Sequence, residues 1–226
     1  VVIRPEVDET RRLRHMPDVT LCLVPRWFLP PRTPLPQPAE MCGFPPVAHG
    51  ALPKELDTFL QAGRAPIVFV PPPGIDLSRF REVTIEALKQ IDRRGVLLAP
   101  GKSDELLFCC ESASTADLAK WASAIVHDGA TATCAAAFSA RVPQLILRGD
   151  DWSSRIGRQI EKLDAGTSIS TAFLTARSLG RRLQRLLYDQ HIAFRCGGIA
   201  QHLQTHDTAA EIRRVIDQRM HGQRPV

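Results

Sequence analysis

Residues 125–147 read IVHDGATATCAAAFSARVPQLIL, and this stretch decides the fold class. Its two ends, residues 125–127 and 145–147, are short apolar runs of the kind that form buried strands. Between them, residues 128–133 form a tight loop of small residues, and residues 134–141 a helix of small residues. A loop that leaves a parallel strand and opens a helix gathers free amides, and open α/β sheets bind phosphorylated ligands there. The stretch therefore predicts a parallel sheet with an anion site at its edge.

Short apolar strands alternate with helices on both sides of this stretch. Strands are predicted at residues 67–70, 96–99, 106–109, 125–127, 145–147 and 167–170, the last as an edge strand. Helices are predicted at residues 54–61, 78–93, 117–122, 134–141, 154–163, 174–188, 191–205 and 208–220. Gly166 is placed as the C-terminal stop of the helix over 154–163. The alternation predicts an α/β fold, a Rossmann-like parallel sheet with helices on both faces.

The first 53 residues have a different character. Residues 19–24 predict a strand, and residues 25–53 hold nine of the eighteen prolines. Such density disfavours a regular helix or a central strand, so an extended linker across a surface is expected. We therefore divide the chain into the end of a preceding domain with its linker (1–53) and one Rossmann-like domain (54–226). The start at Val1, without methionine, leads us to expect a fragment.

The composition excludes several classes of protein. Hydrophobic residues make up 44% of the 226 residues and charged residues 23%, as in ordinary globular chains. No apolar run is long enough to span a membrane, and charges near the N-terminus interrupt any signal peptide. The net charge is +5, and 24 of the 29 basic residues are arginine. These basic residues are spread along the chain, and aromatic residues make up only 6% of it. We therefore expect no nucleic-acid-binding surface, which would need clustered cations and interleaved aromatic rings.

The cysteines favour a reducing compartment. They contain no CxxC pair, so zinc is not expected, and free, mostly buried thiols fit best. The six are Cys22, Cys42, Cys109, Cys110, Cys134 and Cys196. We expect a cytoplasmic protein, with peripheral membrane contact as the alternative.

Residues 113–166 resemble the donor-binding half of bacterial family 1 glycosyltransferases, the group that contains antibiotic, sterol and macrolide glucosyltransferases. The most specific part is Val142-Pro143-Gln144 with its surroundings. Cys42-Gly43-Phe44-Pro45 resembles the family's glycine-phenylalanine-proline after a proline-rich linker, and Pro66 to Val70 its first donor-domain strand. The resemblance covers about residues 20 to 220. It implies the GT-B arrangement, in which two Rossmann-like domains face a cleft and the C-terminal one holds a UDP- or dTDP-linked sugar.

The resemblance also implies which positions contact the donor. The nucleobase is expected to contact Ala113 and Ser114, and the loop after the first strand contributes Gly74. The residues expected to contact the diphosphate are His127, Asp128, Gly129, Thr131 and Thr133. The residues expected to contact the sugar are Asp150, Asp151 and Trp152.

The predicted diphosphate loop departs from the family pattern, in which a histidine, two glycines, a small residue, a glycine and a threonine or serine follow one another. On residues 128–133 only Gly129 and Thr133 match. Asp128 replaces the histidine, and its carboxylate at about 4 Å would oppose a diphosphate by about 1–4 kcal/mol. Ala132 replaces a glycine, which adds a Cβ and disfavours positive φ.

Each position also has a plain structural interpretation. His127 is then a strand-end histidine bonded to a neighbour, and Asp128 a helix N-cap. Asp150 and Asp151 are then an acidic turn that favours a helix dipole, and Trp152 a core or surface residue. A solvated helix face is expected for four arginines, namely Arg177, Arg181, Arg182 and Arg185.

The resemblance implies an inverting transfer of a hexose from a nucleotide sugar to a hydroxyl of a small molecule or lipid. It places the catalytic base on an N-terminal acceptor domain, supplied in cis or in trans. It implies no metal, and no cofactor besides the nucleotide sugar as substrate. The alternative is a catalytically impaired partner or regulatory module with a degenerate donor site.

Overall fold

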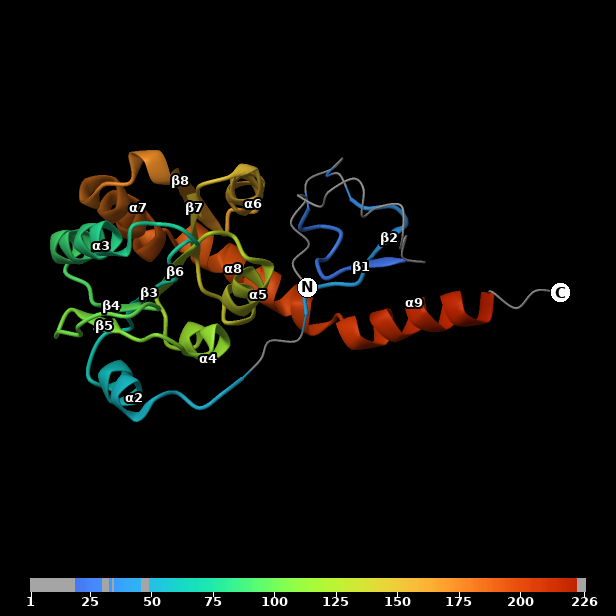
Figure 1. Cartoon of the computed structure of the whole chain (residues 1–226), viewed down its shortest axis with the longest axis horizontal. Coiled ribbons are helices and arrows are strands. Elements are labelled where there is room, and N and C mark those ends of the chain that lie inside the picture. Colours follow the sequence, from blue (N-terminus) through green and yellow to red (C-terminus); the bar gives the residue numbers. More distant parts are fainter. Residues whose placement is uncertain (1–18, 30–32, 34, 46–48, 223–226) are drawn as a thin grey trace.

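A six-stranded parallel sheet forms the centre of the computed structural model, which describes residues 19–29, 33, 35–45 and 49–222 (Figure 1). Its strands are β3 (Ile67–Phe69), β4 (Gly95–Leu97), β5 (Leu107–Cys109), β6 (Ala124–His127), β7 (Gln144–Arg148) and β8 (Gly166–Ser170). They lie in the order β5-β4-β3-β6-β7-β8, and every neighbouring pair is parallel. The predicted Rossmann-like α/β fold and the edge position of the last strand are confirmed.

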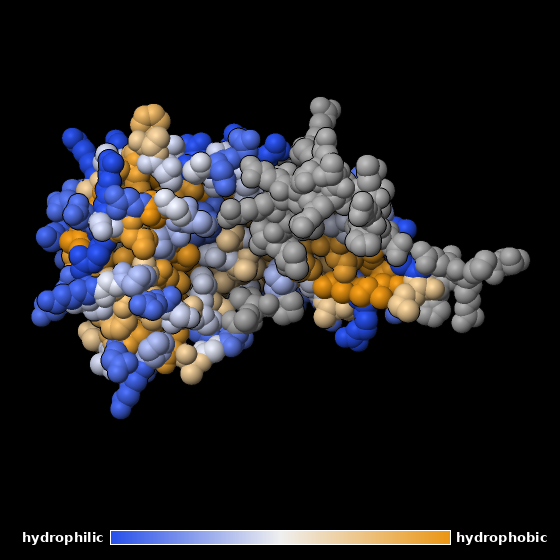
Figure 2. All heavy atoms as spheres, in the orientation of Figure 1, coloured by the Kyte–Doolittle hydropathy of each residue, from blue (hydrophilic) through white to orange (hydrophobic). Residues whose placement is uncertain are grey.

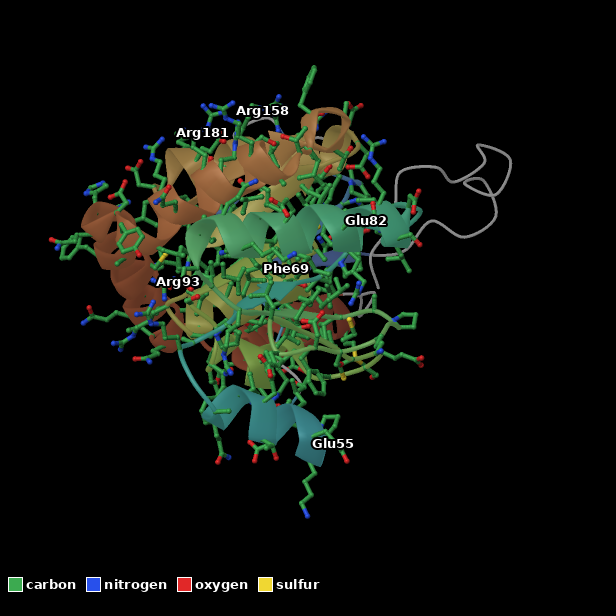
Figure 3. All side chains as sticks on the ribbon, turned by 90° about the vertical axis from the view of Figure 1, so that its left-hand side faces the viewer. Glu55, Phe69, Glu82, Arg93, Arg158 and Arg181 are labelled. Atoms are coloured by element: carbon green, nitrogen blue, oxygen red, sulfur yellow. The ribbon has the colours of Figure 1, made fainter. Side chains whose placement is uncertain are left out.

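Helices cover both faces of the sheet. The helices between the strands are α2 (Lys54–Gln61), α3 (Leu77–Ile91), α4 (Thr115–Ala119), α5 (Thr131–Ser139) and α6 (Asp151–Lys162). Leu56 of α2 packs in one buried cluster with Val68 and Ile125, while Phe80 of α3 belongs to the cluster on the opposite face with Phe69. Figure 1 shows α3 and α7 above the sheet and α2 and α4 below it. In Figure 3, Phe69 lies at the centre of the body, whereas Glu55 and Glu82 point outward from α2 and α3.

The chain after β8 is helical. A short 3-10 helix η1 (Thr171–Phe173) leads into α7 (Ala176–Tyr188), α8 (Gln190–Gln204) and α9 (Thr208–Gly222). Helix α3 packs on α7, and α5 packs on α8. Helix α9 extends from the body alongside β1 and β2 (Figure 1).

The proline-rich segment contains a strand that the sequence did not predict. β1 (Thr20–Cys22) pairs in parallel with β2 (Ala39–Met41), which lies inside the expected linker. Phe28 in the same segment is fully buried and meets Phe44 and Phe138 in an aromatic cluster around Trp27. The view of 25–53 as a surface-crossing linker is therefore wrong for this part, because its aromatic side chains complete the core beside α5. The domain boundary at residue 53 stays a prediction.

The expected role of Gly166 is wrong. Helix α6 ends at Lys162, and the turn beyond it uses Asp164 in the left-handed region at φ 53°. Gly166 instead begins β8, where an added Cβ would overlap the Gln144 carbonyl oxygen. The glycine is required because β8 approaches the backbone of β7 closely at this point.

Candidate functional site

The strand order places the candidate site at the carboxyl ends of β3 and β6. The chain proceeds from β3 through β4 to β5 in one direction, then returns to β6 and continues through β7 to β8 in the other. The loops that follow β3 and β6 therefore lie side by side and lead to opposite faces. Open α/β sheets bind ligands at such a switch point, because the diverging loops leave a crevice.

One helix at this edge has an uncapped N-terminus. Asp76 caps α3, Ser114 caps α4 and Asp150 caps α6, each by accepting backbone N–H bonds through its side chain. The N-cap of α5 is Ala130, which offers no side-chain acceptor. The first amides of α5 consequently have no partner within the helix, and with the helix dipole they form a site suited to an anion.

His127 belongs to the core rather than to the ligand surface. It is fully buried, its Nε2 lies 3.0 Å from Gln144 Oε1, and the Gly129 amide donates to its Nδ1 at 3.1 Å. Since Nδ1 accepts, the proton is on Nε2 and is donated to Gln144. Burial lowers the pKa of His127 to about 4, against the opposing effect of the Gln144 bond. The geometry leaves neither ring nitrogen for a phosphate and matches the strand-end histidine bonded to a neighbour.

Asp128 does not cap α5, so that expectation is wrong. Its Oδ1 accepts a hydrogen bond from the Ala130 amide at 3.0 Å, and the helix begins only at Thr131. The loop is thus closed by its own side chains, because His127 takes the Gly129 amide and Asp128 takes the Ala130 amide. The amides that remain for a ligand are those of the first turn of α5.

The predicted diphosphate loop is shorter than expected. Thr131, Ala132 and Thr133 all lie in the first turn of α5, and Thr133 is buried. Ala132 is exposed and helical and is not among the residues with positive φ, so a glycine is not needed there. Gly129 does adopt φ +87°, and an added Cβ would lie 3.0 Å from Ile156.

The other predicted contacts lie on the neighbouring loops. Ala113 and Ser114 precede α4 and are half-buried, with the Ser114 hydroxyl accepting from the Asp117 amide. Gly74 is exposed after β3, at φ +76°. These residues and the α5 N-terminus all follow the carboxyl ends of strands, but their contacts with a donor stay predictions.

The predicted sugar-binding residues form the start of α6. The Asp150 carboxylate accepts from the Ser153 amide at 2.7 Å and from its hydroxyl at 2.6 Å, so it caps α6, a role that the sequence interpretation had not given it. Asp151 and Trp152 are exposed in the first turn of the helix, where an acid favours the dipole. Sugar binding by these residues stays a prediction.

Two contributors were missed from the sequence. Gln144 supplies the partner of His127 from the neighbouring strand, and Ala130 leaves α5 uncapped. A polar residue opening an otherwise apolar strand was the available signal for Gln144. No local signal marks Ala130, because alanine has no side-chain acceptor that would identify it as an N-cap.

Within residues 19–29, 33, 35–45 and 49–222, no group of three or more His, Cys, Asp or Glu side chains is arranged to hold a metal ion. No helix in those same residues has the length and apolar character needed to cross a bilayer.

Several solved structures that superpose on this chain are glycosyltransferases. The spinosyn forosaminyltransferase SpnP superposes with a TM-score of 0.70 at 22% identity, over 88% of this chain and 54% of that chain. The glycosyltransferase of kitacinnamycin superposes with a TM-score of 0.71 at 19% identity, over 95% of this chain and 58% of that chain. VinC, solved in complex with dTDP, superposes with a TM-score of 0.70 at 20% identity, over 90% of this chain and 52% of that chain. No protein-family model matches the chain, and no curated protein sequence matches it.

These comparisons establish the fold. The chain spans little more than half the length of each of the three glycosyltransferases. It is a Rossmann-like α/β domain of the kind that forms one half of a GT-B glycosyltransferase. The resemblance to family 1 glycosyltransferases is confirmed at the level of the fold.

Proposed function

We propose that this chain is the donor-binding domain of a glycosyltransferase, which transfers a hexose from a UDP- or dTDP-linked sugar to a hydroxyl of a small molecule or lipid. The observation that carries the proposal is the uncapped N-terminus of α5 at the β3–β6 switch point. The capped α3, α4 and α6 leave α5 as the helix beside those loops that is suited to a diphosphate.

In the proposed reaction, the acceptor oxygen attacks the anomeric carbon opposite the nucleotide, and the bond to the diphosphate breaks with inversion. The first-turn amides of α5 and the Thr131 hydroxyl hold the diphosphate and stabilise the charge that develops on it. A base on an N-terminal domain, in cis or in trans, takes the acceptor proton. No metal and no further cofactor enters this scheme, and the proposed location is bacterial cytoplasm.

Ala130→Asp tests the anion site directly. An aspartate at this N-cap would accept the free amides of α5, raise stability by about 1 kcal/mol and exclude the diphosphate by charge. Thermal unfolding is followed with UDP, UDP-glucose, dTDP and dTDP-glucose. A nucleotide that binds only the folded chain, at a free concentration of 100 times its Kd, raises the free energy of unfolding by about 2.7 kcal/mol.

Pro53→Asp is the matched control, because α2 also lacks a side-chain cap but follows no strand of the sheet. It is expected to leave the nucleotide response intact, whereas Ala130→Asp abolishes it. If no nucleotide stabilises the native chain, or if Ala130→Asp responds as the native chain does, the proposed function is wrong.

A second pair of variants tests the substitutions in the loop. Asp128→His removes the carboxylate that faces the Ala130 amide, and we expect it to raise nucleotide affinity. Ala132→Gly is expected to change affinity little, because Ala132 already has helical geometry.

A further inference from the structure

The free edge of the sheet, where β8 lies between α6 and α7, is rich in arginine. The segment from Arg148 to Tyr188 carries eight basic and four acidic residues, which accounts for most of the net charge of +5. Helix α7 has four arginines and no acid. The basic residues are spread along the sequence, but most of the net positive charge falls within this segment.

The arginines of this region are largely unpaired. Arg158, Arg177 and Arg181 are exposed and form no ion pair with any described residue. Arg185 approaches Asp189 at 3.8 Å with a largely exposed side chain, a contact worth little in water. In Figure 3, Arg158 of α6 and Arg181 of α7 both point away from the body on its upper side. We call Arg158, Arg177, Arg181 and Arg185 the arginine face.

The edge strand beneath this face is blocked at its middle residue, Ser168, against pairing with another strand. Ser168 donates its amide to Glu161 Oε1 at 2.8 Å, and its carbonyl accepts from Arg182 Nε at 3.1 Å. Both outward-pointing backbone groups of Ser168 are thus occupied by side chains, a common protection against strand addition. An extended peptide partner at this edge is disfavoured.

An exposed phenylalanine stands at the end of the arginine face. Phe173 closes η1, and its side chain is 75% exposed. The Ser178 hydroxyl donates to the Phe173 carbonyl at 3.0 Å, and a Thr175–Ser178 capping box fixes the start of α7 just beyond it. Figure 2 shows an apolar protrusion at the top of the view, where η1 leads into α7, with hydrophilic residues on both sides. An exposed apolar ring on a hydrogen-bonded turn beside cations matches a bilayer interface, in which the ring inserts and the cations meet headgroups.

We propose that the arginine face and Phe173 form a peripheral binding surface for an anionic lipid bilayer. A nucleic acid is less well matched, because α7 carries no aromatic ring between its arginines on which bases could stack. The proposal goes beyond the donor site and holds whether or not α5 binds a nucleotide.

Sedimentation of the full chain with vesicles tests this surface. We expect binding to vesicles of equal phosphatidylcholine and phosphatidylglycerol, little binding to pure phosphatidylcholine, and release in high salt. Arg181→Gln and Arg185→Gln should each weaken partitioning roughly fivefold, as for one interfacial cation. Phe173→Ser should weaken it further. Phe173→Trp should show a blue-shifted emission with the mixed vesicles.

The chain offers matched controls. Phe194 on α8 is 76% exposed, and Arg213 on α9 is exposed, both outside the arginine face. Phe194→Ser and Arg213→Gln should leave partitioning unchanged. Equal losses in the control variants, absence of binding to either vesicle, or binding to a single-stranded oligonucleotide in place of mixed vesicles would each overturn the proposal.

Discussion

His127 and Gln144, on neighbouring strands β6 and β7, share a buried hydrogen bond of 3.0 Å. His127 also accepts the Gly129 amide, so one imidazole joins two strands and fixes the loop that leads to α5. Protonation of Nδ1 would replace an acceptor by a second donor facing the Gly129 amide. The start of the candidate site therefore depends on a neutral histidine.

This dependence predicts a loss of stability in acid. The pKa of His127 is about 4 in the folded chain against 6.5 as its ordinary value, so the unfolded chain binds the proton more readily. The stabilising contribution is complete above about pH 6.5 and falls by about 3 kcal/mol as the pH drops to about 4. Denaturant unfolding between pH 7.5 and 4 measures it. The His127→Gln variant should be less stable at pH 7.5, but its free energy of unfolding should fall less on acidification. If the free energy of unfolding fell equally with pH in both proteins, the acid effect would not come from His127.

Gly166→Ala is expected to destabilise the chain by about 3 kcal/mol or more, because its Cβ would collide with a backbone oxygen that cannot move alone. Gly197→Ala is the matched control, since nothing lies within 4 Å of an added Cβ in the middle of α8. The free energy of unfolding of the Gly197→Ala control should rise by about 0.5–1 kcal/mol, because alanine has the higher helix propensity. Urea midpoints compare the two, and equal effects would show that β7 and β8 are not packed as described.

Asp117 holds the segment before α2 against α4. Its carboxylate accepts from His49 at 2.9 Å, from the Gly50 amide at 2.8 Å and from Lys120 at 2.7 Å. The Lys120 bond, followed by the Gly50 and His49 bonds, lowers the pKa of Asp117, so the contribution is present at neutral pH and is lost in strong acid. Asp117→Asn should speed amide exchange at residues 49–52 while leaving β6 protected. Unchanged exchange there would argue against the anchor.

The thiols should react in the order of their burial. Cys110 is half-buried, whereas Cys134 and Cys196 lie in the core, and burial raises the pKa of both core thiols. A disulfide reagent should modify Cys110 in a fast phase and Cys134 only on unfolding. Cys110→Ser should remove part of the fast phase. A fast phase of the same amplitude in that variant would show that another thiol is the accessible one.

The order of elements followed from local patterns. The predicted helix at 54–61 coincides with α2, and the predicted strand at 67–70 overlaps β3 within one residue. The spacing of apolar residues predicts such a helix or strand, because that spacing depends only on residues that are close together in the sequence. β2 was missed because its pairing with β1 depends on distant residues, and prolines around it masked the signal. The start of α5 was misplaced because threonine is a preferred N-cap residue, yet Thr131 and Thr133 both lie inside the first turn and Ala130 occupies the N-cap.

The sequence by itself determined that this chain builds a parallel α/β sheet with a small-residue loop and helix at its centre, since burial and periodicity are written locally. Only the tertiary structure decided which groups of that loop are free. It buried His127 against Gln144, turned Asp128 onto the Ala130 amide and left the first turn of α5 uncapped. These outcomes depend on strand register and on the close approach of chain segments, which bring together hydrogen-bond partners that no sequence window contains.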